Sequence, residues 1–305
     1  MPKSNTLSKA GRLRDLLAGK TIAIPGAFNA LTAMQIERAG YDALYVSGAA
    51  ISAVRGLPDI GLLSLEQVAG EARTIAKSVA IPVIVDADTG FGPASAIPAA
   101  VRSFEEAGLA GMQIEDQQLP KKCGHLAGKE LVQTHDMVSK IRAAVESRHD
   151  PGFLIVARTD ARSVEGMDKA VHRSLAYAEA GADALFPEAL QSEREFELFS
   201  SAMSKAGIEV PLIANMTEFG KSPYLSVSRF GELGYRGVLF PVSLLRIAMR
   251  AIERFLADLK EAGSQRDVLQ QMMTRAELYE LLQYDPTALQ ERRAYESNNE
   301  RAAGG

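Results

Sequence analysis

The sequence is poor in the residues that build disulfides and zinc sites. Its 305 residues include one cysteine, four histidines and no tryptophan. Cys123 alone cannot form a disulfide within the chain, which favours an intracellular compartment. No CxxC or HxxxH spacing is present, so zinc is disfavoured. The chain also lacks a run of about 18 apolar residues, which a transmembrane helix requires, and the apolar centre of a signal peptide. We therefore expect a cytoplasmic protein.

A bias towards one sign of charge is absent as well. The chain has 34 Lys and Arg against 38 Asp and Glu, a net charge of -4, and both signs are interspersed. We therefore expect neither nucleic acid nor a membrane surface as a partner. With 47% hydrophobic residues, the composition is typical of a globular protein with a sizeable core.

What the sequence does contain is a repeat of helical pattern, glycine and short apolar run. Helical patterns end at Gly40, Gly108, Gly181 and Gly234, and an apolar run follows each glycine. Glycine is typical of a helix end, and the run after it indicates a strand. Other apolar runs are entered through proline. Together the runs predict eight strands, beginning near residues 21, 42, 82, 111, 153, 183, 211 and 237.

Eight short apolar strands that alternate with amphipathic helices favour one fold. Nearly continuous apolar strands indicate a parallel sheet buried on both faces. Eight such units in roughly 250 residues are typical of a TIM barrel, the (β/α)8 fold of the α/β class. An open α/β sheet is the alternative, and the missing GxGxxG motif counts against its dinucleotide-binding form. We expect one domain over residues 1–284, with surplus C-terminal helices packed on another subunit, and a polar, disordered tail at 285–305.

Polar residues stand where such a barrel has its active site, at the C-terminal ends of the strands. Asp86 and Asp88 have the i, i+2 spacing that places two side chains on one face of a strand, and Glu115 ends the neighbouring strand. Three adjacent carboxylates repel one another unless a cation joins them, and oxygen ligands suit Mg²⁺, or alternatively Mn²⁺. One isolated Asp is often only a helix cap. The set of three favours a metal site.

Cationic and polar residues at the same ends predict a pocket for a small polycarboxylate. Arg158, Arg246 and Arg275 could clamp carboxylates with paired hydrogen bonds. Arg275 is the weakest member, because an arginine on a late helix more often lies at the surface. The predicted pocket is completed by Asn215, Thr217, Ser243 and the backbone around Ser47, Gly48 and Ala49.

A long segment, residues 117–132, follows the fourth predicted strand. Its length and glycines are typical of a lid over a barrel mouth. Cys123 lies in it, with Lys121 and His125 close by in sequence. Nearby cations stabilise a thiolate, so this thiol could exchange a proton near neutral pH. The alternative, a buried and inert cysteine, fits an exposed polar loop less well.

Several of these segments have a familiar form. The pentapeptide KKCGH at 121–125 resembles the signature of the isocitrate lyase and phosphoenolpyruvate mutase superfamily, with Cys123 in the place of the catalytic cysteine. The compact length, together with GLPDIG at 56–61 and TRAELYE at 274–280, resembles its methylisocitrate lyase branch. Further segments that resemble family motifs are VDADTGFG at 85–92, QIEDQ at 113–117, ARTDA at 157–161, LFPEA at 185–189 and NMTEFG at 215–220.

The resemblance implies a Mg²⁺-dependent carbon–carbon lyase that cleaves 2-methylisocitrate into pyruvate and succinate in propionate catabolism. It implies that Cys123 protonates the departing fragment and that Lys121 and His125 tune its acidity. Phe186 and Leu239 would contact the substrate methyl group. It also implies a homotetramer with exchanged C-terminal helices. Three residues are candidates for the base that removes the hydroxyl proton: Tyr45, Glu188 and Asp59. Gly124 and Glu188 also belong to the predicted substrate-binding set.

Other functions on the same scaffold remain alternatives. These are a dimethylmalate lyase, an isocitrate lyase, an oxaloacetate decarboxylase, and a phosphonopyruvate mutase or hydrolase. A catalytically silent barrel that serves as a binding protein is a further alternative, but it predicts the loss of some metal, thiol or arginine positions, and all of them are filled.

Overall fold

A computed structural model describes residues 7–122, 124–125 and 128–286 of the chain. The chain divides into two compact units, one up to Ala251 and one from Ile252 onwards. Whether residues 1–284 form one domain stays a prediction. Almost all of the predicted tail at 285–305 lies outside the described residues.

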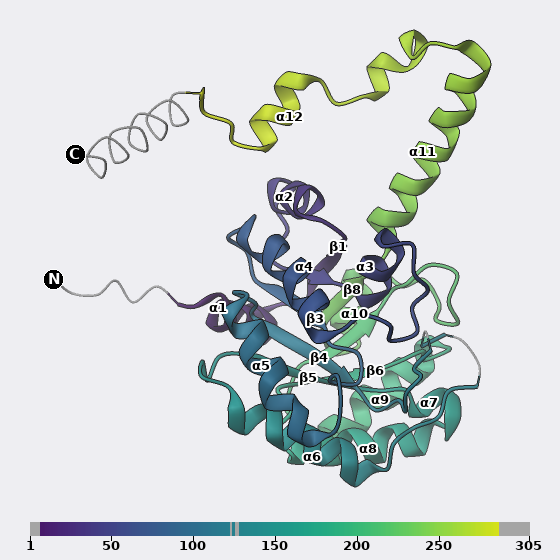
Figure 1. The fold of residues 1–305 in the computed structure, drawn as a ribbon. Coiled ribbons are helices and arrows are strands. Elements are labelled where there is room, and N and C mark those ends of the chain that lie inside the picture. The colour runs from purple at the N-terminus through teal and green to yellow at the C-terminus, as the bar shows by residue number, and fades with distance from the viewer. Residues whose placement is uncertain (1–6, 123, 126–127, 287–305) are drawn as a thin grey trace, which may run out of the picture. The chain divides into compact units, whose positions relative to one another are not determined.

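The first unit is a closed parallel barrel, as the sequence predicts. Its strands pair in chain order, and the first pairs with the last, so the sheet has no free edge. Figure 1 shows the strands at the centre with helices around them. The strands are β1 (Ile22–Ala27), β2 (Leu44–Val46), β3 (Val83–Asp86), β4 (Gly111–Glu115), β5 (Leu154–Thr159), β6 (Ala184–Pro187), β7 (Leu212–Asn215) and β8 (Tyr235–Phe240).

Four helices, α2, α5, α8 and α10, end two residues before the glycines that the sequence pattern indicates. Gly40, Gly108, Gly181 and Gly234 all have positive φ angles between 84° and 99°, the conformation that glycine adopts after a helix. The helices of this unit are α1 (Lys9–Gly19), α2 (Ala30–Arg38), α3 (Gly48–Val54), α4 (Leu65–Lys77), the 3₁₀ turn η1 (Ala94–Ala96), α5 (Ile97–Glu106), α6 (Thr134–Ser147), α7 (Ala161–Val164), α8 (Met167–Glu179), α9 (Glu193–Lys205) and α10 (Val227–Glu232).

Two apolar layers hold the barrel together. Because side chains alternate along a strand, one set faces the barrel interior and the other faces the helices. On β5, Leu154 and Val156 belong to the interior cluster and Ile155 to the outer one. Leu13 and Leu17 of α1 join the interior cluster and are fully buried. The interior is therefore a packed core, and it leaves the strand ends as the place for a site.

The last long helix, α11 (Ser243–Ala262), runs from the first unit into the second. The second unit also contains η2 (Arg266–Gln271) and α12 (Arg275–Leu281). Within the described residues, no helix is both long and apolar enough to cross a membrane. The packing of these helices on another subunit stays a prediction.

Candidate active site

A cavity of about 90 Å³ lies at the C-terminal ends of the strands. A larger depression of about 700 Å³ lies at the opposite end of the barrel, among α9, α10 and the starts of β7 and β8. We assign the site to the smaller cavity because most predicted site residues line it. These are Tyr45, Ser47, Ala49, Asp59, Asp86, Lys121, Gly124, His125, Arg158, Phe186, Glu188, Asn215, Thr217, Leu239 and Arg246.

Asp86 and Asp88 come together through a tight turn. Asp86 ends β3, and Asp88 lies beyond the strand with a φ of 46°. The N–H of Asp88 donates to Oδ1 of Asp86 at 3.1 Å, and the N–H of Gly48 donates to Oδ2 at 3.2 Å. A Cβ on Gly48 would lie 3.1 Å from Asp86 Oδ2 and 3.3 Å from Asp88 Oδ1. Glycine at 48 therefore keeps open the space between the two carboxylates and the start of α3.

A buried lysine lies against this acidic pair. Lys121 Nζ is 2.6 Å from Asp88 Oδ1 and 2.5 Å from Asp59 Oδ1, and its side chain is 3% exposed. Burial favours the neutral amine, but Glu115 and the three aspartates around it raise the pKa of Lys121 above its ordinary value. The lysine is therefore charged, and it supplies one cation to a group of carboxylates that exceeds it in number.

The fit of this group to a divalent cation rests on an unsatisfied carboxylate oxygen and on the burial of the carboxylates. Glu115 is buried, and its Oε1 has neither a hydrogen bond nor an ion pair with any described residue. Burial raises the pKa of Glu115 well above its ordinary value, and burial together with Asp86 raises the pKa of Asp88 to about 6. Buried carboxylates of this kind are the hard oxygen donors that Mg²⁺ takes.

The same carboxylates do not form a closed cage. Within the described ranges, no three His, Cys, Asp or Glu side chains are close enough to hold a metal ion by themselves. Mg²⁺ commonly keeps several waters and uses only one or two carboxylates, so an open group suits it. Asp86, Asp88 and Glu115 fit a site of that kind.

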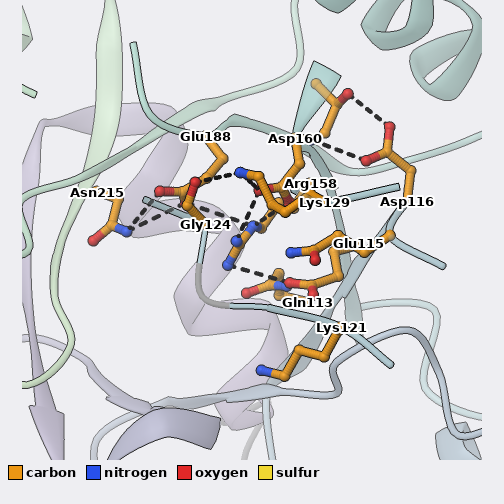
Figure 2. Close-up of polar contacts among 12 residues, drawn as sticks. Gln113, Glu115, Asp116, Lys121, Gly124, Lys129, Arg158, Asp160, Glu188 and Asn215 are labelled. Atoms are coloured by element: carbon orange, nitrogen blue, oxygen red, sulfur yellow. Dashed lines mark hydrogen bonds and ion pairs between the residues drawn. The ribbon is translucent and has the colours of Figure 1, made fainter. Parts of the chain in front are cut away.

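Arg158 is the cation on the other side of the cavity. It extends from β5 and contacts three buried carboxylates (Figure 2): Glu115 at 3.2 Å, Asp160 at 3.0 Å and Glu188 at 3.5 Å. Its guanidinium also lies over the ring of Phe186, 5.4 Å from the centroid. Burial opposes the charge, but Asp160 and the two glutamates raise the pKa of Arg158 well above its ordinary value. Arg158 therefore has a fixed position and a permanent charge.

Glu188 has the opposite electrostatics from Glu115. Burial alone would raise the pKa of Glu188, but Arg158, His125 and Lys129 outweigh it and lower the pKa to about 2. His125 Nε2 lies 2.9 Å from Glu188 Oε1. Asn215 donates to the same carboxylate at 3.2 and 3.3 Å, while its own Oδ1 has no partner among the described residues. Glu188 is therefore ionised.

Tyr45 is held as a neutral phenol. Its hydroxyl donates to Oε1 of Gln113 at 2.6 Å. Burial, then the charge of Asp86, raises the pKa of Tyr45 well above 10. Sequence reasoning missed Gln113, although it lies within the QIEDQ segment and on β4, where its side chain contacts Tyr45 of the cavity lining. The Nε2 atom of Gln113 has no partner among the described residues.

The remaining predicted residues differ in what the structure says of them. Ser47 caps α3, and Ser243 donates to Glu218. Arg246 donates to the carbonyl of Glu218 and lies over the ring of Phe219. Arg275 begins α12 in the second unit. Cys123, the predicted proton donor, lies outside the described residues.

A closed barrel whose mouth gathers buried carboxylates, a lysine and an arginine around a small cavity has the arrangement of a barrel enzyme that handles small anions. Residues 13–260 match the phosphoenolpyruvate phosphomutase (PEP_mutase) family. The chain belongs to this family, and the predicted superfamily is confirmed.

Relatives and solved structures are similar over nearly the whole chain. A 2-methylisocitrate lyase from Aeropyrum pernix is 50% identical and covers 89% of this chain and 86% of its own length. One from Bacillus subtilis is 48% identical, over 90% and 89%. A crystal structure of phosphonopyruvate hydrolase in complex with oxalate and Mg²⁺ has a TM-score of 0.83 at 30% identity, and covers 95% of this chain and 99% of its own.

Proposed function

We propose that this protein is a Mg²⁺-dependent carbon–carbon lyase that cleaves 2-methylisocitrate into pyruvate and succinate, as in propionate catabolism. The name of relatives at about half identity over nearly the whole chain supports the substrate. One structural observation carries the chemistry: buried carboxylates, of which Glu115 has an oxygen without a hydrogen-bond partner among the described residues, stand on one side, and a fixed arginine stands on the other.

Asp88 would hold the cation, which is Mg²⁺ or alternatively Mn²⁺, with Asp86 and Glu115 acting mostly through water. When bound, such a cation lowers the pKa of the substrate hydroxyl and stabilises negative charge on its oxygen. A solved relative that contains Mg²⁺ supports this proposal. Lys121, already between Asp88 and Asp59, keeps the acidic group in place.

The substrate carboxylates bind to the cationic and polar lining of the cavity. Arg158 and Arg246 are the lining arginines, and Arg275 is proposed as a third. Asn215 Oδ1 and Nε2 of Gln113, each without a described partner, offer an acceptor and a donor to the ligand. The full proposed set also includes Ser47, Gly48, Ala49, Asp59, Gly124, Glu188, Thr217 and Ser243.

An apolar wall gives the site a preference for a methyl group. Phe186 is buried beneath the guanidinium of Arg158, and Leu239 lines the same cavity. A methyl group in an apolar pocket is worth about 1 to 3 kcal/mol of discrimination. We therefore expect methylisocitrate to be cleaved faster than isocitrate, by about 10-fold or more.

Two proton transfers complete the reaction. A base removes the hydroxyl proton, the carbon–carbon bond breaks, the oxygen becomes the keto group of pyruvate, and the bonding electron pair stays on the succinate carbon. The candidate bases are Tyr45, Glu188 and Asp59. Glu188, with a pKa of about 2, is always ionised but weakly basic, whereas Tyr45 is strongly basic only after it loses its proton. The thiol of Cys123 then donates a proton to the carbanion, and Lys121 and His125 tune that thiol.

A panel of substrates tests the function. The purified protein is incubated with Mg²⁺ and, separately, methylisocitrate, isocitrate, dimethylmalate, oxaloacetate and phosphonopyruvate, and both products are quantified by NMR. We expect equal amounts of pyruvate and succinate from methylisocitrate, abolished by EDTA and restored by Mg²⁺. Faster turnover of another compound would replace the proposed substrate with that compound, and no turnover of any would leave a silent barrel.

The role of Cys123 has its own test. Cys123→Ser should reduce turnover by about 100-fold or more, because the serine hydroxyl is a far weaker acid than the thiol. Mg²⁺ affinity, measured by isothermal titration calorimetry, should stay unchanged. Full activity in this variant would remove Cys123 from the mechanism.

We also propose a homotetramer in which the C-terminal helices are exchanged between subunits. Helix α11 supports this, because Met249, Ile252 and Leu256 repeat at i, i+3 and i+7 on one face and are each about half exposed, at 48%, 48% and 56%. Light scattering measures the mass: a tetramer is expected, and Met249→Glu combined with Leu256→Glu should lower it. A monomeric wild-type protein would contradict the proposal. A cytoplasmic location remains a prediction.

A further inference from the structure

The segment between β4 and α6 contains a second buried lysine that the mechanism above does not use. Lys129 Nζ donates to the carbonyl oxygen of Gly124 and lies 2.6 Å from Oδ1 of Asp160 (Figure 2). Its side chain is 1% exposed, and that of Asp160 is fully buried. A buried ammonium is costly unless it is paired, so these two contacts fix where Lys129 lies.

Asp160 links this lysine to Arg158. Arg158 donates to Asp160 through Nε at 3.0 Å and through Nη2 at 3.2 Å. The N–H of Asp160 donates to Oδ1 of Asp116 at 2.9 Å, which ties Asp160 to the end of β4. One carboxylate, held by the barrel itself, therefore bonds both Arg158 in the site and Lys129 in the segment.

Gly124 lies so close to Arg158 and Glu188 that no side chain would fit at its position. A Cβ on Gly124 would lie 2.4 Å from Arg158 Nη2 and 2.5 Å from Glu188 Cγ. Residue 124 can therefore be held only through its backbone groups, and Lys129 donates a hydrogen bond to its carbonyl oxygen. Lys129 therefore pins the backbone at the point where the segment touches Arg158 and Glu188.

A lysine that merely neutralises Asp160 would not need this second bond. Arg158 already gives Asp160 two charge-assisted hydrogen bonds. We infer that Lys129 is a positioning residue: it holds Gly124, and with it the neighbouring His125, against the barrel mouth by bonding the Gly124 carbonyl and Asp160 together. This inference rests on the proposed lyase function.

The first test compares two lysines of the same segment. Lys129→Met removes the ammonium but keeps the length of the apolar part of the side chain. We expect kcat to fall by about 100-fold, because small misplacements of reacting groups have effects of that size, with Mg²⁺ affinity unchanged within about twofold. Lys122→Met is the matched control. Lys122 Nζ bonds the Gly128 carbonyl within the segment and does not bond Asp160, so its effect should be at least about 10-fold smaller.

A second measurement does not depend on turnover. Cys123 is the only cysteine, so the rate of its alkylation by iodoacetamide reports on the residue next to Gly124. We expect alkylation to be at least about fivefold faster in Lys129→Met than in wild type and in Lys122→Met, because releasing Gly124 lowers the local stability of the segment. If the wild-type protein cleaves none of the panel substrates, the lyase proposal fails, and this comparison still tests Lys129.

A third comparison of variants separates positioning from charge neutralisation, and it can still be made if Lys129→Met does not fold. Asp160→Asn is compared with the double variant Asp160→Asn, Lys129→Met, which lacks both buried charges. Positioning predicts that the double variant has at least about 10-fold lower kcat than Asp160→Asn, and that Lys129→Arg recovers at least about a tenth of wild-type kcat. A double variant as active as Asp160→Asn, or unchanged kcat and alkylation in Lys129→Met, would overturn the inference.

Discussion

Glu188 offers the sharpest quantitative check on the electrostatics of the site. Its folded-state pKa of about 2 lies below the ordinary value of 4.5, because Arg158, His125 and Lys129 together outweigh the effect of burial. The difference between the two pKa values corresponds to about 3 kcal/mol in favour of the ionised form in the folded state. Since glutamine imitates the protonated glutamate, Glu188→Gln should lower the free energy of unfolding by about 3 kcal/mol at pH 7.

The loss should depend on pH in a defined direction. A carboxyl whose pKa is lowered on folding stabilises the protein above its unfolded pKa, and this contribution disappears as pH falls through the folded pKa. The difference between wild type and Glu188→Gln should therefore be constant above about pH 6, smaller at pH 4, and close to zero towards pH 2. Urea unfolding of the metal-free proteins, at one fixed protein concentration, measures it.

A partly exposed ion pair provides the control. Glu195 accepts two hydrogen bonds from Arg162, at 2.6 and 2.8 Å, with 19% of its side chain exposed. Solvent screens such a pair, so Glu195→Gln should cost about 1 kcal/mol or less. If Glu188→Gln were as stable as wild type at pH 7, the cost of burial would exceed the attraction of the cations. The account of the site given above would then be refuted.

Two further changes test the scaffold beneath the site. Asp116 is fully buried and accepts hydrogen bonds from two hydroxyls and a backbone N–H, so Asp116→Ala should lower the free energy of unfolding by about 3 kcal/mol or more; a loss under about 1 kcal/mol in urea would contradict this. At Gly26 an added Cβ would lie 2.0 Å from the carbonyl oxygen of Pro241, so Gly26→Ala should yield no folded protein by circular dichroism, whereas Gly19→Ala, with nothing within 4 Å, should fold normally.

The fold was predictable because its signal repeats along the chain. The predicted strand starts lie within two residues of those of β1 to β8. Each repeat pairs a short apolar run with an amphipathic helix, and glycines such as Gly108 and Gly181 mark the change from one to the other. Tertiary packing follows the same periodicity, so local pattern and global structure agree.

The site was predictable only as far as the strands determine it. Strand ends meet at one face of a parallel barrel, so the gathering of Asp86, Arg158 and Glu188 around one cavity follows from where the strands end. The hydrogen-bond and ion-pair partners of the site residues do not follow from the strand ends. The contacts of Lys121 with Asp88, and of Lys129 with Gly124, depend on an irregular segment whose path no periodicity encodes.

The two sides of the cavity differ in charge. At the β3 and β4 ends, the carboxylates outnumber the cations, and Glu115 keeps an oxygen without a partner. At the β5 and β6 ends, Glu188 is surrounded by Arg158 and His125 and stays ionised even in acid. Neighbouring carboxylates whose pKa values are driven apart in this way take different chemical parts. The acid-rich side needs a cation, and so it suits the substrate hydroxyl. Under the proposed function, the side anchored by Arg158 accepts the negative charge of the fragment that departs, whereas a substrate bound the other way round would place that charge beside the carboxylates of the acid-rich side.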